Sequence, residues 1–360
     1  MNRPGTAREP LDVTGNNGNQ RLTGWLPTTR SRQVILAFSV TLGIALVAAL
    51  AIGAVPIPLL AAMFGDHALG ELERMVLLEL RIPRVMLAAT VGAGLAISGA
   101  CLQGMFRNPL AEPQLIGVSS GAALGAIAVI VFADGLMIPD AARPYLLPLA
   151  AFGGAGVVTT WLYWFSARRG DLGIATMLLV GIAVNALAGV GIGVFTYLAD
   201  DGQLRTLTFW TLGSFGSAEW STALPAMALM AVAIASLLPL ARRLDVLQLG
   251  ETEARHVGVE IPRLKRRVVF GCAAAVGAGV AVAGIVGFVG LVVPHLARLT
   301  GNALHGYLLP ATVLLGAALT VAADLGARTL ITPAELPVGL ITSALGAPFF
   351  LWLIARIRAR

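Results

Sequence analysis

Long stretches of the chain carry no charged residue, and their lengths suit helices that cross a membrane. A spanning helix needs about 20 apolar residues. Backbone groups in lipid must be satisfied within a helix or a closed barrel, and these stretches are too long and too uniformly apolar for barrel strands. The pattern therefore predicts an all-α polytopic membrane protein. The uncharged stretches are residues 33–65, 85–106, 114–132, 144–165, 174–198, 221–241 and 268–294.

The last third of the chain requires one additional division. The apolar stretch over residues 268–297 is too long for one ordinary span, and glycine or proline interrupts it at positions 284, 287, 290 and 294. We expect a span near 268–283 followed by a short, broken helix near 288–300. Two further spans are expected at 305–327 and 338–354, which brings the predicted total to ten membrane helices.

The basic residues support this topology through the positive-inside rule. With the amino terminus in the cytoplasm and ten alternating spans, 19 of the 25 basic residues fall on the cytoplasmic side. Residues 1–32 are polar, contain five arginines and are expected to form a disordered cytoplasmic tail. Residues 33–357 are expected to form the membrane domain, with a cytoplasmic polar segment at 242–267.

A short internal repeat relates the two halves of the chain. The segment at residues 91–99 reads VGAGLAISG, and the segment at 276–284 reads VGAGVAVAG, with six of nine positions identical. Five predicted spans separate the copies, so they cross the membrane in opposite directions. This is the inverted-repeat pattern of many transporters. The alternative is chance similarity, because small residues favour close helix packing in membranes generally.

Composition excludes several classes of protein. Hydrophobic residues make up 57% of the chain and charged residues 12%, with a mean hydropathy of +0.82. A soluble domain is about half apolar and about a quarter charged, so a soluble enzyme, a disordered protein and a nucleic-acid binder are excluded. The net charge of +6 therefore reports membrane topology. The two cysteines, Cys101 and Cys272, lie in apolar runs and are expected to be buried.

The chain lacks the chemistry needed to power transport by itself. Its one lysine, Lys265, is followed by Arg266, so no GxxxxGK[ST] phosphate-binding loop is present. The predicted spans also lack the carboxylates and histidines that proton- or sodium-coupled transporters use as relays. The nearest candidates, Asp324 and His295, are expected to be structural. Energy for transport is therefore expected from a partner protein.

Two polar segments are candidate docking sites. In the cytoplasmic segment 242–267, Glu251 to His256 is expected to form a short helix that ends at Gly258. Such a helix could enter a groove on a cytoplasmic subunit; the alternative is a solvated basic loop that only fixes topology.

The second candidate lies outside, at the start of the second span. Arg81 and Arg84 flank Pro83, which suits a first helical turn, so both guanidiniums are expected to project from one helix mouth. Arg328 lies at another outer helix end. A partner bearing carboxylates would explain these arginines through charge-assisted bonds. The alternative is contact with lipid phosphates by snorkelling.

Several motifs, in order, resemble the permeases that import iron-siderophores, heme and cobalamin, which are the membrane subunits of type II ABC importers. The signature stretch at the second and third spans reads RIPRVMLAATVGAGLAISGACLQGMFRNPLAEPQLIGVSSGAALGA. The carboxy-terminal signatures read GFVGLVVPHLARLTG and ADLGARTLITPAELPVGLITSALGAPFFLWL. The resemblance covers roughly residues 33–357.

The resemblance implies partners and a location. It implies a homodimer with the path along its two-fold axis, two cytoplasmic ATPase subunits that bind ATP and Mg²⁺, and a periplasmic binding protein. The chain itself is then a transport subunit of the bacterial inner membrane, with no catalytic residue, no bound cofactor or metal, and no nucleic-acid partner.

The resemblance also assigns candidate site residues. The positions that match contacts to the binding protein are Arg81, Arg84 and Arg328. Those that match the segment docked on the ATPase are Glu251, Ala254, Arg255 and Gly258. Those that match the cytoplasmic gate are Asn108, Pro109, Leu110 and, at the inner end of the fifth span, Thr176.

One loop bears on the cargo. Residues 196–215, TYLADDGQLRTLTFWTLGSF, look more like the heme-importing branch than the others. Heme is therefore the expected cargo, with ferric siderophore and cobalamin as alternatives. Arg205 could meet a heme propionate on entry or could be an ordinary loop arginine. A different class, an ATP-independent secondary transporter, is disfavoured by the missing relays.

Overall fold

The computed structural model describes residues 29–55, 57–58, 69–135, 137–168 and 174–358. Across these ranges the chain is helical and contains no β-strand, which confirms the all-α prediction. The α-helices are α1 (Thr29–Ala51), α3 (Glu71–Met75), α4 (Ile82–Phe106), α5 (Val118–Phe132), α6 (Arg143–Arg168), α7 (Ile174–Leu198), α8 (Asp201–Leu212), α9 (Trp220–Leu237), α10 (Ala241–Leu247), α11 (Glu251–His256), α12 (Ile261–Ala283), α13 (Val289–Thr300), α14 (His305–Thr329) and α15 (Val338–Arg358). A π-helical turn spans Val76–Arg81, and short 3₁₀ turns span Pro113–Ile116, Ala133–Gly135 and Leu238–Leu240.

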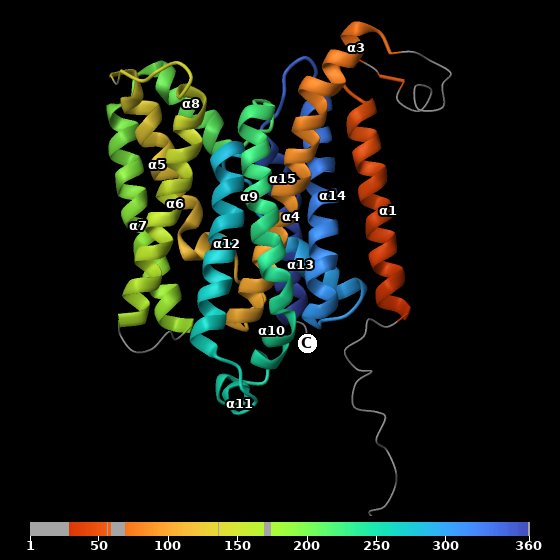
Figure 1. The fold of residues 1–360 in the computed structure, drawn as a ribbon, viewed down its shortest axis with the longest axis vertical. Coiled ribbons are helices and arrows are strands. Elements are labelled where there is room, and N and C mark those ends of the chain that lie inside the picture. Colours follow the sequence, from red (N-terminus) through yellow and green to blue (C-terminus); the bar gives the residue numbers. More distant parts are fainter. Residues whose placement is uncertain (1–28, 56, 59–68, 136, 169–173, 359–360) are drawn as a thin grey trace, which may run out of the picture.

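Most long helices run side by side, with α11 projecting at one end of the bundle and α3 at the other (Figure 1). Seven described helices are long and apolar enough to cross a membrane. Three shorter apolar helices, α5, α13 and part of α15, accompany them. The predicted division of the last apolar stretch is confirmed, because α12 ends at Ala283 and α13 begins at Val289. The total of ten spans stays a prediction.

The first helix begins earlier than the predicted tail boundary. The tail was expected to extend to residue 32, whereas α1 starts at Thr29 and includes Arg30 and Arg32 in its first turn. Charged side chains at a helix end can extend to the membrane interface, so they need not end a span. Residues 1–28, and with them most of the predicted tail, lie outside the described residues.

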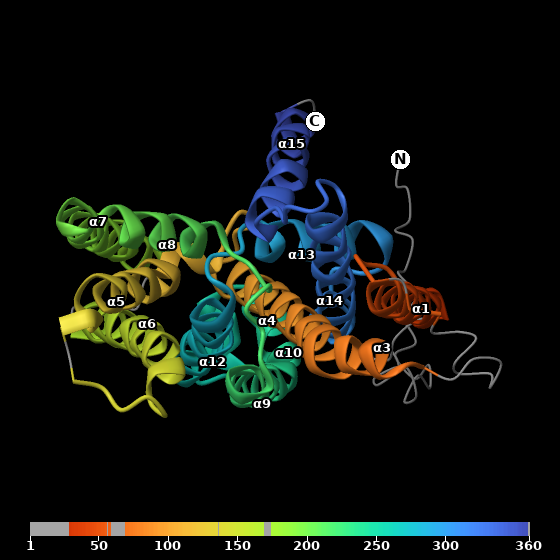
Figure 2. The ribbon, with the colours of Figure 1, turned by 90° about the horizontal axis from the view of Figure 1, so that it is seen from above.

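Helix α4 forms the centre of the bundle. Twenty of its 25 residues are buried, and α14, α12, α9 and α13 surround it (Figure 2). Its many glycines and alanines allow these helices to approach closely, which is how helices associate in membranes. Helix α1 lies at the edge, where only Ser31 and Ala49 are buried. The core therefore sits around α4, and α1 is attached to it from outside.

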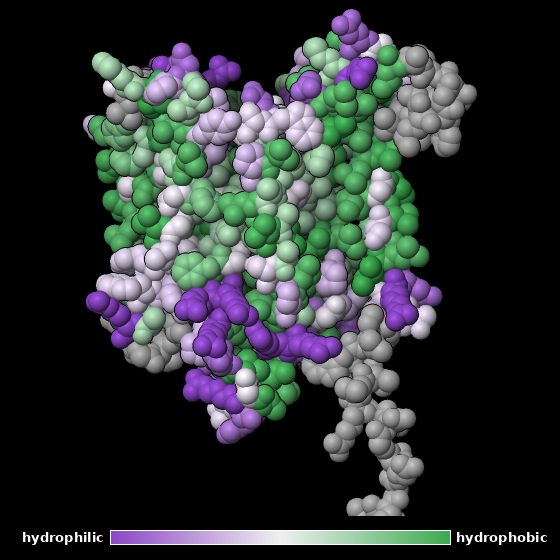
Figure 3. Space-filling model, viewed as in Figure 1, coloured by the Kyte–Doolittle hydropathy of each residue, from purple (hydrophilic) through white to green (hydrophobic). Residues whose placement is uncertain are grey.

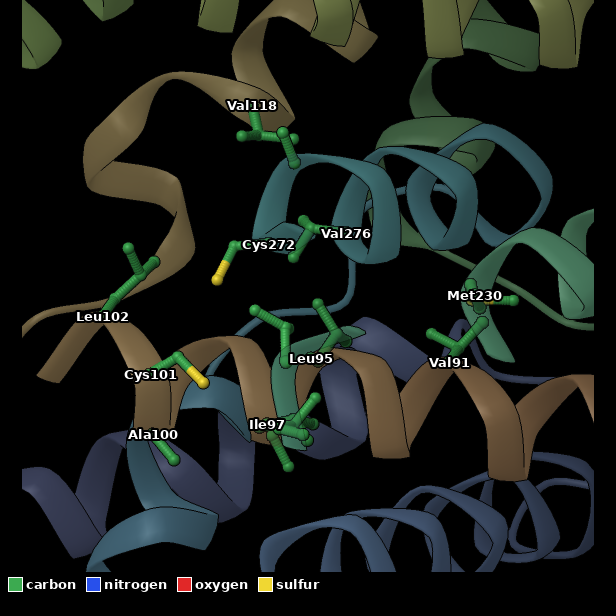
Figure 4. Close-up of a cluster of buried hydrophobic side chains, with 14 of the residues drawn as sticks. Val91, Leu95, Ile97, Ala100, Cys101, Leu102, Val118, Met230, Cys272 and Val276 are labelled. Carbon is green, nitrogen blue, oxygen red and sulfur yellow. The ribbon is translucent and has the colours of Figure 1, made fainter. Parts of the chain in front are cut away.

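The two copies of the internal repeat pack against each other in opposite directions. In α4 and α12, Gly94 faces Ala275 and Gly279 faces Val91. Adding or subtracting the 185-residue offset of the repeat maps one contact almost onto the other. The contact is therefore close to symmetric about a two-fold axis between the helices, as an inverted repeat requires. Figure 4 shows the same packing, with Leu95 and Cys101 of α4 on the side of Val276 and Cys272 of α12, and with Val91 beside Met230 of α9. Both cysteines are buried, as expected.

A substitution at Gly99 tests how tightly α4 packs against α13. A Cβ atom at Gly99 would overlap the backbone carbonyl of Gly290 in α13. We expect Gly99→Val to lower thermal stability strongly, because overpacking costs about 1–3 kcal/mol even where neighbours can shift and a helix backbone shifts less easily. The control is Gly43→Val in α1, where no atom lies within 4 Å of the added position. Equal melting temperatures for the two purified variants would contradict this packing.

Candidate functional site

Arg81 lies beneath the end of α1 and does not reach the outer surface. It ends the π-helical turn that leads into α4 and is 5% exposed. Its guanidinium donates hydrogen bonds to the carbonyl oxygens of Leu50 (2.7 Å), Ala51 (3.1 Å) and Val55. The last carbonyls of a helix have no partner within the helix and form the negative end of its dipole. Arg81 therefore caps the carboxyl end of α1.

Arg84 joins α4 to α14 and to the loop after it. Its Nε and Nη2 atoms donate to the Asp324 carboxylate at 3.0 and 2.9 Å, and Nη1 lies 2.9 Å from Glu335. Asp324 is almost fully buried, whereas the Glu335 side chain is 47% exposed. Bidentate arginine–carboxylate pairs are strong and geometrically specific, so Asp324 has the structural role expected of it.

Arg328 completes the cluster from α14. Its Nη2 donates to the carbonyl oxygen of Ala49 at the end of α1, and its Nε lies 3.6 Å from Asp324. Two arginines from different helices thus hold the last turn of α1. We call Arg81, Arg84, Arg328, Asp324 and Glu335 the outer arginine cluster.

The expectation that Arg81 and Arg84 project together from a helix mouth is wrong. Both guanidiniums have partners within the bundle, because α1 ends beside the start of α4 and α14 brings Asp324 to the same place. These partners lie 26 to 251 residues away in the sequence. Docking of a binding protein on these arginines remains a prediction, and Glu335 is the exposed acid of the cluster.

At the cytoplasmic end, the predicted short helix is confirmed as α11, which protrudes from the bundle (Figure 1). The Glu251 carboxylate lies 2.7 Å from the ammonium of Lys265 in α12, and Lys265 is 2% exposed. Ala254 is fully buried, and Gly258 adopts a left-handed conformation with φ of 85° that favours glycine. The Arg255 side chain is exposed, and its Nη2 lies 3.8 Å from the other carboxylate oxygen of Glu251. Glu251 and Ala254 therefore fix α11 to the bundle, and Arg255 adds an exposed ion pair within α11; contact of Arg255 with an ATPase stays a prediction.

The predicted gate residues follow the end of α4 in a tight turn. Asn108 Oδ1 accepts a hydrogen bond from the amide of Leu110 at 2.9 Å, and Pro109 and Leu110 are exposed. Arg107, just before the turn, has a left-handed φ of 50°. Asparagine commonly stabilises such turns by bonding the backbone two residues on.

Helix α10 and the residue that follows it contact the ends of α4 and α14. Gln248 Nε2 donates to the carbonyl oxygen of Gly104 near the end of α4, at 2.7 Å. Asp245 Oδ1 accepts from the backbone amide of His305 at 2.8 Å and contacts the ring Nδ1 at 2.6 Å. The ends of α4, α10 and α14 are thus held together. Sequence reasoning missed Gln248, Asp245 and His305, because nothing local marks residues 60 and 144 positions apart as partners.

Thr176 lies apart from the turn at residues 108–110. It is half-buried in the first turn of α7, and no hydrogen bond or ion pair of the described chain joins it to that turn. A polar network instead joins α7 to α5 and to the turn before it. Asn185 of α7 donates to the Gln114 carbonyl at 3.1 Å and contacts Ser120 of α5. No hydrogen bond or ion pair of the described residues therefore links the two parts of the predicted gate, and their joint role stays a prediction.

The non-helical residues between α12 and α13 contact the loop that follows α4. The backbone amide of Phe288, immediately before α13, donates to Glu112 Oε1 at 3.3 Å. Non-helical backbone at membrane depth is tolerated where it is buried in protein or lines a path, and transporters use such broken helices at their central sites. Among the residues with described positions, no three His, Cys, Asp or Glu side chains gather as metal ligands.

Comparison with known proteins decides the family. The sequence profile of the FecCD transport family matches residues 41–356. The chain belongs to the FecCD transport family. This confirms the resemblance drawn from the motifs and makes the chain a multi-pass permease subunit of a type II ABC importer, in which the ATPase is a separate protein.

Relatives of this FecCD permease import different cargoes. It is 49% identical to the hemin transport system permease protein HmuU of Yersinia pestis over 283 residues, covering 78% of this chain and 83% of the relative. It is 40% identical to the cobalamin import system permease protein BtuC of Halobacterium salinarum, covering 84% and 80%. A solved structure of a metal-chelate type ABC transporter in an inward-facing conformation matches with a TM-score of 0.81 and 32% identity, covering 90% of this chain and 99% of that one.

Proposed function

We propose that this permease imports heme as a homodimer in the bacterial inner membrane. It takes heme from a periplasmic binding protein, and two cytoplasmic ATPase subunits, which bind ATP and Mg²⁺, drive the transfer. The observation that carries the assignment is the 49% identity to the hemin permease, compared with 40% to the cobalamin permease. Cobalamin and ferric siderophore are the alternative cargoes.

The outer helix α8 supports heme as the cargo. Heme is a flat aromatic macrocycle with two propionates, so an entry surface benefits from exposed rings and a guanidinium. The Arg205 guanidinium lies 5.9 Å from the ring centre of Phe209, which is 52% exposed, and Tyr197 just before the helix is 89% exposed. Figure 2 shows α8 between α7 and the group formed by α13 and α15. We assign no axial ligand to the iron.

The cytoplasmic contacts support a mechanism in which α11 transmits movement of the ATPase. Closure of the ATPase pair displaces α11, and the Glu251–Lys265 pair passes the displacement to α12. Helix α10 passes it to the end of α4 through Gln248, and so to the turn at residues 108–110. Release of heme needs no tight site in the path, because the binding protein supplies the specificity.

The outer arginine cluster is proposed to receive the binding protein by exchange of carboxylates. Glu335 is exposed and pairs with Arg84 at its outer side, while Asp324 holds the inner side of the same guanidinium. A carboxylate of the binding protein takes the place of Glu335 without disturbing the buried pair. Arg81 and Arg328 contribute by keeping α1 in position beside it.

Removal of the Gln248 side-chain amide tests the proposed link between α11 and the turn at residues 108–110. We expect Gln248→Leu to lower the amount of heme imported per ATP several-fold, because the Gly104 carbonyl then keeps only the longer bond from the Arg107 amide, at 3.4 Å, and the contact between the end of α10 and α4 is lost. ATP hydrolysis by the assembled complex should persist. The control, Gln33→Leu, removes an exposed amide at the cytoplasmic end of α1. An unchanged import ratio in Gln248→Leu would remove α10 from the pathway.

The cargo is tested by stimulation of ATP hydrolysis. The permease and its ATPase are reconstituted in vesicles and mixed with cognate binding protein loaded with heme, ferric siderophore or cobalamin. We expect heme-loaded protein to stimulate hydrolysis and the other two to leave it near the unliganded rate. Stimulation by cobalamin or siderophore alone would reassign the cargo and leave the permease assignment in place.

A further inference from the structure

A largely apolar groove follows the line where α9 packs on α12. Its volume is about 530 Å³, and its walls include Leu229 and Val232 of α9 and Phe270 of α12. Val232 is 67% exposed and Phe270 38% exposed. Small side chains, Ala233 and Ala274, leave the space open between the two helices. Exposed apolar side chains on membrane-spanning helices need a lipid or protein surface to cover them.

The length of the groove matches one leaflet of the bilayer. Along α9 and the turn after it, the lining extends from Leu229 to Leu240. Eleven helical rises of about 1.5 Å give roughly 16 Å, which is about half of the 30 Å hydrocarbon core. The groove is thus about as long as one acyl chain of a lipid in the cytoplasmic leaflet.

The cytoplasmic end of the groove carries two arginines. Arg243 of α10 and Arg267 of α12 both line it. Both are exposed, and within the described ranges neither takes part in a hydrogen bond or ion pair. Figure 3 shows a hydrophilic band over the lower part of this face, directly beneath an apolar surface. The pair of guanidiniums therefore lies where the phosphates of the inner leaflet lie.

The groove lies away from the side on which the transport path is expected. Seen from above, α9 lies at the edge opposite α15, and α5, α6 and α12 separate it from α7, which carries the predicted gate residue Thr176 (Figure 2). A second copy placed against the α7 side would leave the groove open to lipid.

We propose that this groove binds one anionic phospholipid of the cytoplasmic leaflet. Its phosphate lies between Arg243 and Arg267, and one acyl chain follows the groove between α9 and α12. Guanidiniums bind phosphate oxygens bidentately, and basic pockets between membrane helices on the cytoplasmic side select anionic headgroups. The bound lipid contacts α9, α10 and α12 beside the cytoplasmic segment 242–267.

Native mass spectrometry of the full chain in detergent tests the site, with phosphatidylglycerol and phosphatidylcholine as the probes. Arg243→Gln combined with Arg267→Gln should weaken binding of phosphatidylglycerol about 25-fold, at about fivefold for each arginine near an anionic surface. Binding of phosphatidylcholine should not change. The matched control, Arg242→Gln with Arg266→Gln, removes two neighbouring exposed arginines that do not line the groove and should keep phosphatidylglycerol bound.

A second variant separates a lipid site from other uses of the arginines. Ala274→Phe fills the groove and leaves both arginines in place, so it should also abolish selective retention of phosphatidylglycerol. Retention in Ala274→Phe, or equal weakening by both arginine pairs, would overturn the site. So would loss of ATPase association in the Arg243/Arg267 variant with lipid binding intact. These experiments measure lipid binding and ATPase association rather than transport, so their results do not depend on the proposed cargo.

Discussion

Charge reversal at Arg81 is expected to prevent folding of the chain rather than to weaken docking alone. Arg81→Glu would place a carboxylate against the carbonyl oxygens of Leu50, Ala51 and Val55, at a position 5% exposed. Each carbonyl left without a donor costs about 1–3 kcal/mol, and a buried unpaired charge costs more. Total stabilities of about 5–15 kcal/mol leave little margin. The measurement is the yield and melting temperature of the purified chain.

Two further variants make this prediction specific. Arg74→Glu, in the exposed helix α3, makes the same charge change at the same end of the bundle and should leave folding unaffected. Arg81→Lys keeps the charge but lacks the planar fork of the guanidinium, so its melting temperature should lie between those of wild type and Arg81→Glu. A well-folded Arg81→Glu chain that fails only to bind the binding protein would contradict the capping role.

Removal of the Glu251 carboxylate is expected to uncouple ATP hydrolysis from import. In Glu251→Ala, the buried ammonium of Lys265 loses a partner 2.7 Å away, and α11 loses its ionic contact with α12. Loss of a charged partner at a buried group costs about 1–3 kcal/mol or more, and 1.4 kcal/mol is already tenfold. We expect about tenfold less heme imported per ATP in reconstituted vesicles, with basal hydrolysis retained.

The matched control lies in the same polar segment. Glu260 pairs with Arg263 at 2.8 Å, and both side chains are more than half exposed. Exposed pairs contribute about 0–1 kcal/mol, so Glu260→Ala should leave coupling unchanged. If Glu251→Ala couples as well as wild type, or if both variants lose coupling equally, α11 does not act through Lys265.

The sequence pattern predicted the helices well because a long apolar stretch without charged residues is enough to identify a membrane helix. The break between α12 and α13 followed from the glycines and the proline that interrupt the apolar stretch, and the end of α11 followed from Gly258. The boundary of α1 was misplaced by a few residues, because arginines in a first helical turn do not interrupt a span.

The side-chain partners could not be predicted in the same way. Arg81 looked like a surface residue because its spacing to Arg84 is local, whereas its acceptors lie at the end of another helix. Gln248 and His305 carried no recognisable motif, since one side-chain amide and one imidazole gain their roles only when α10, α4 and α14 meet. Residue-level roles therefore depended on packing that composition does not encode.

Transport by the complete assembly is the most direct test of the account. The permease is reconstituted in vesicles with its ATPase, and heme is supplied on the heme-loaded binding protein. We predict that heme accumulates against its gradient only when ATP, the ATPase and the binding protein are all present. Accumulation against the gradient by this chain alone in lipid would contradict the account.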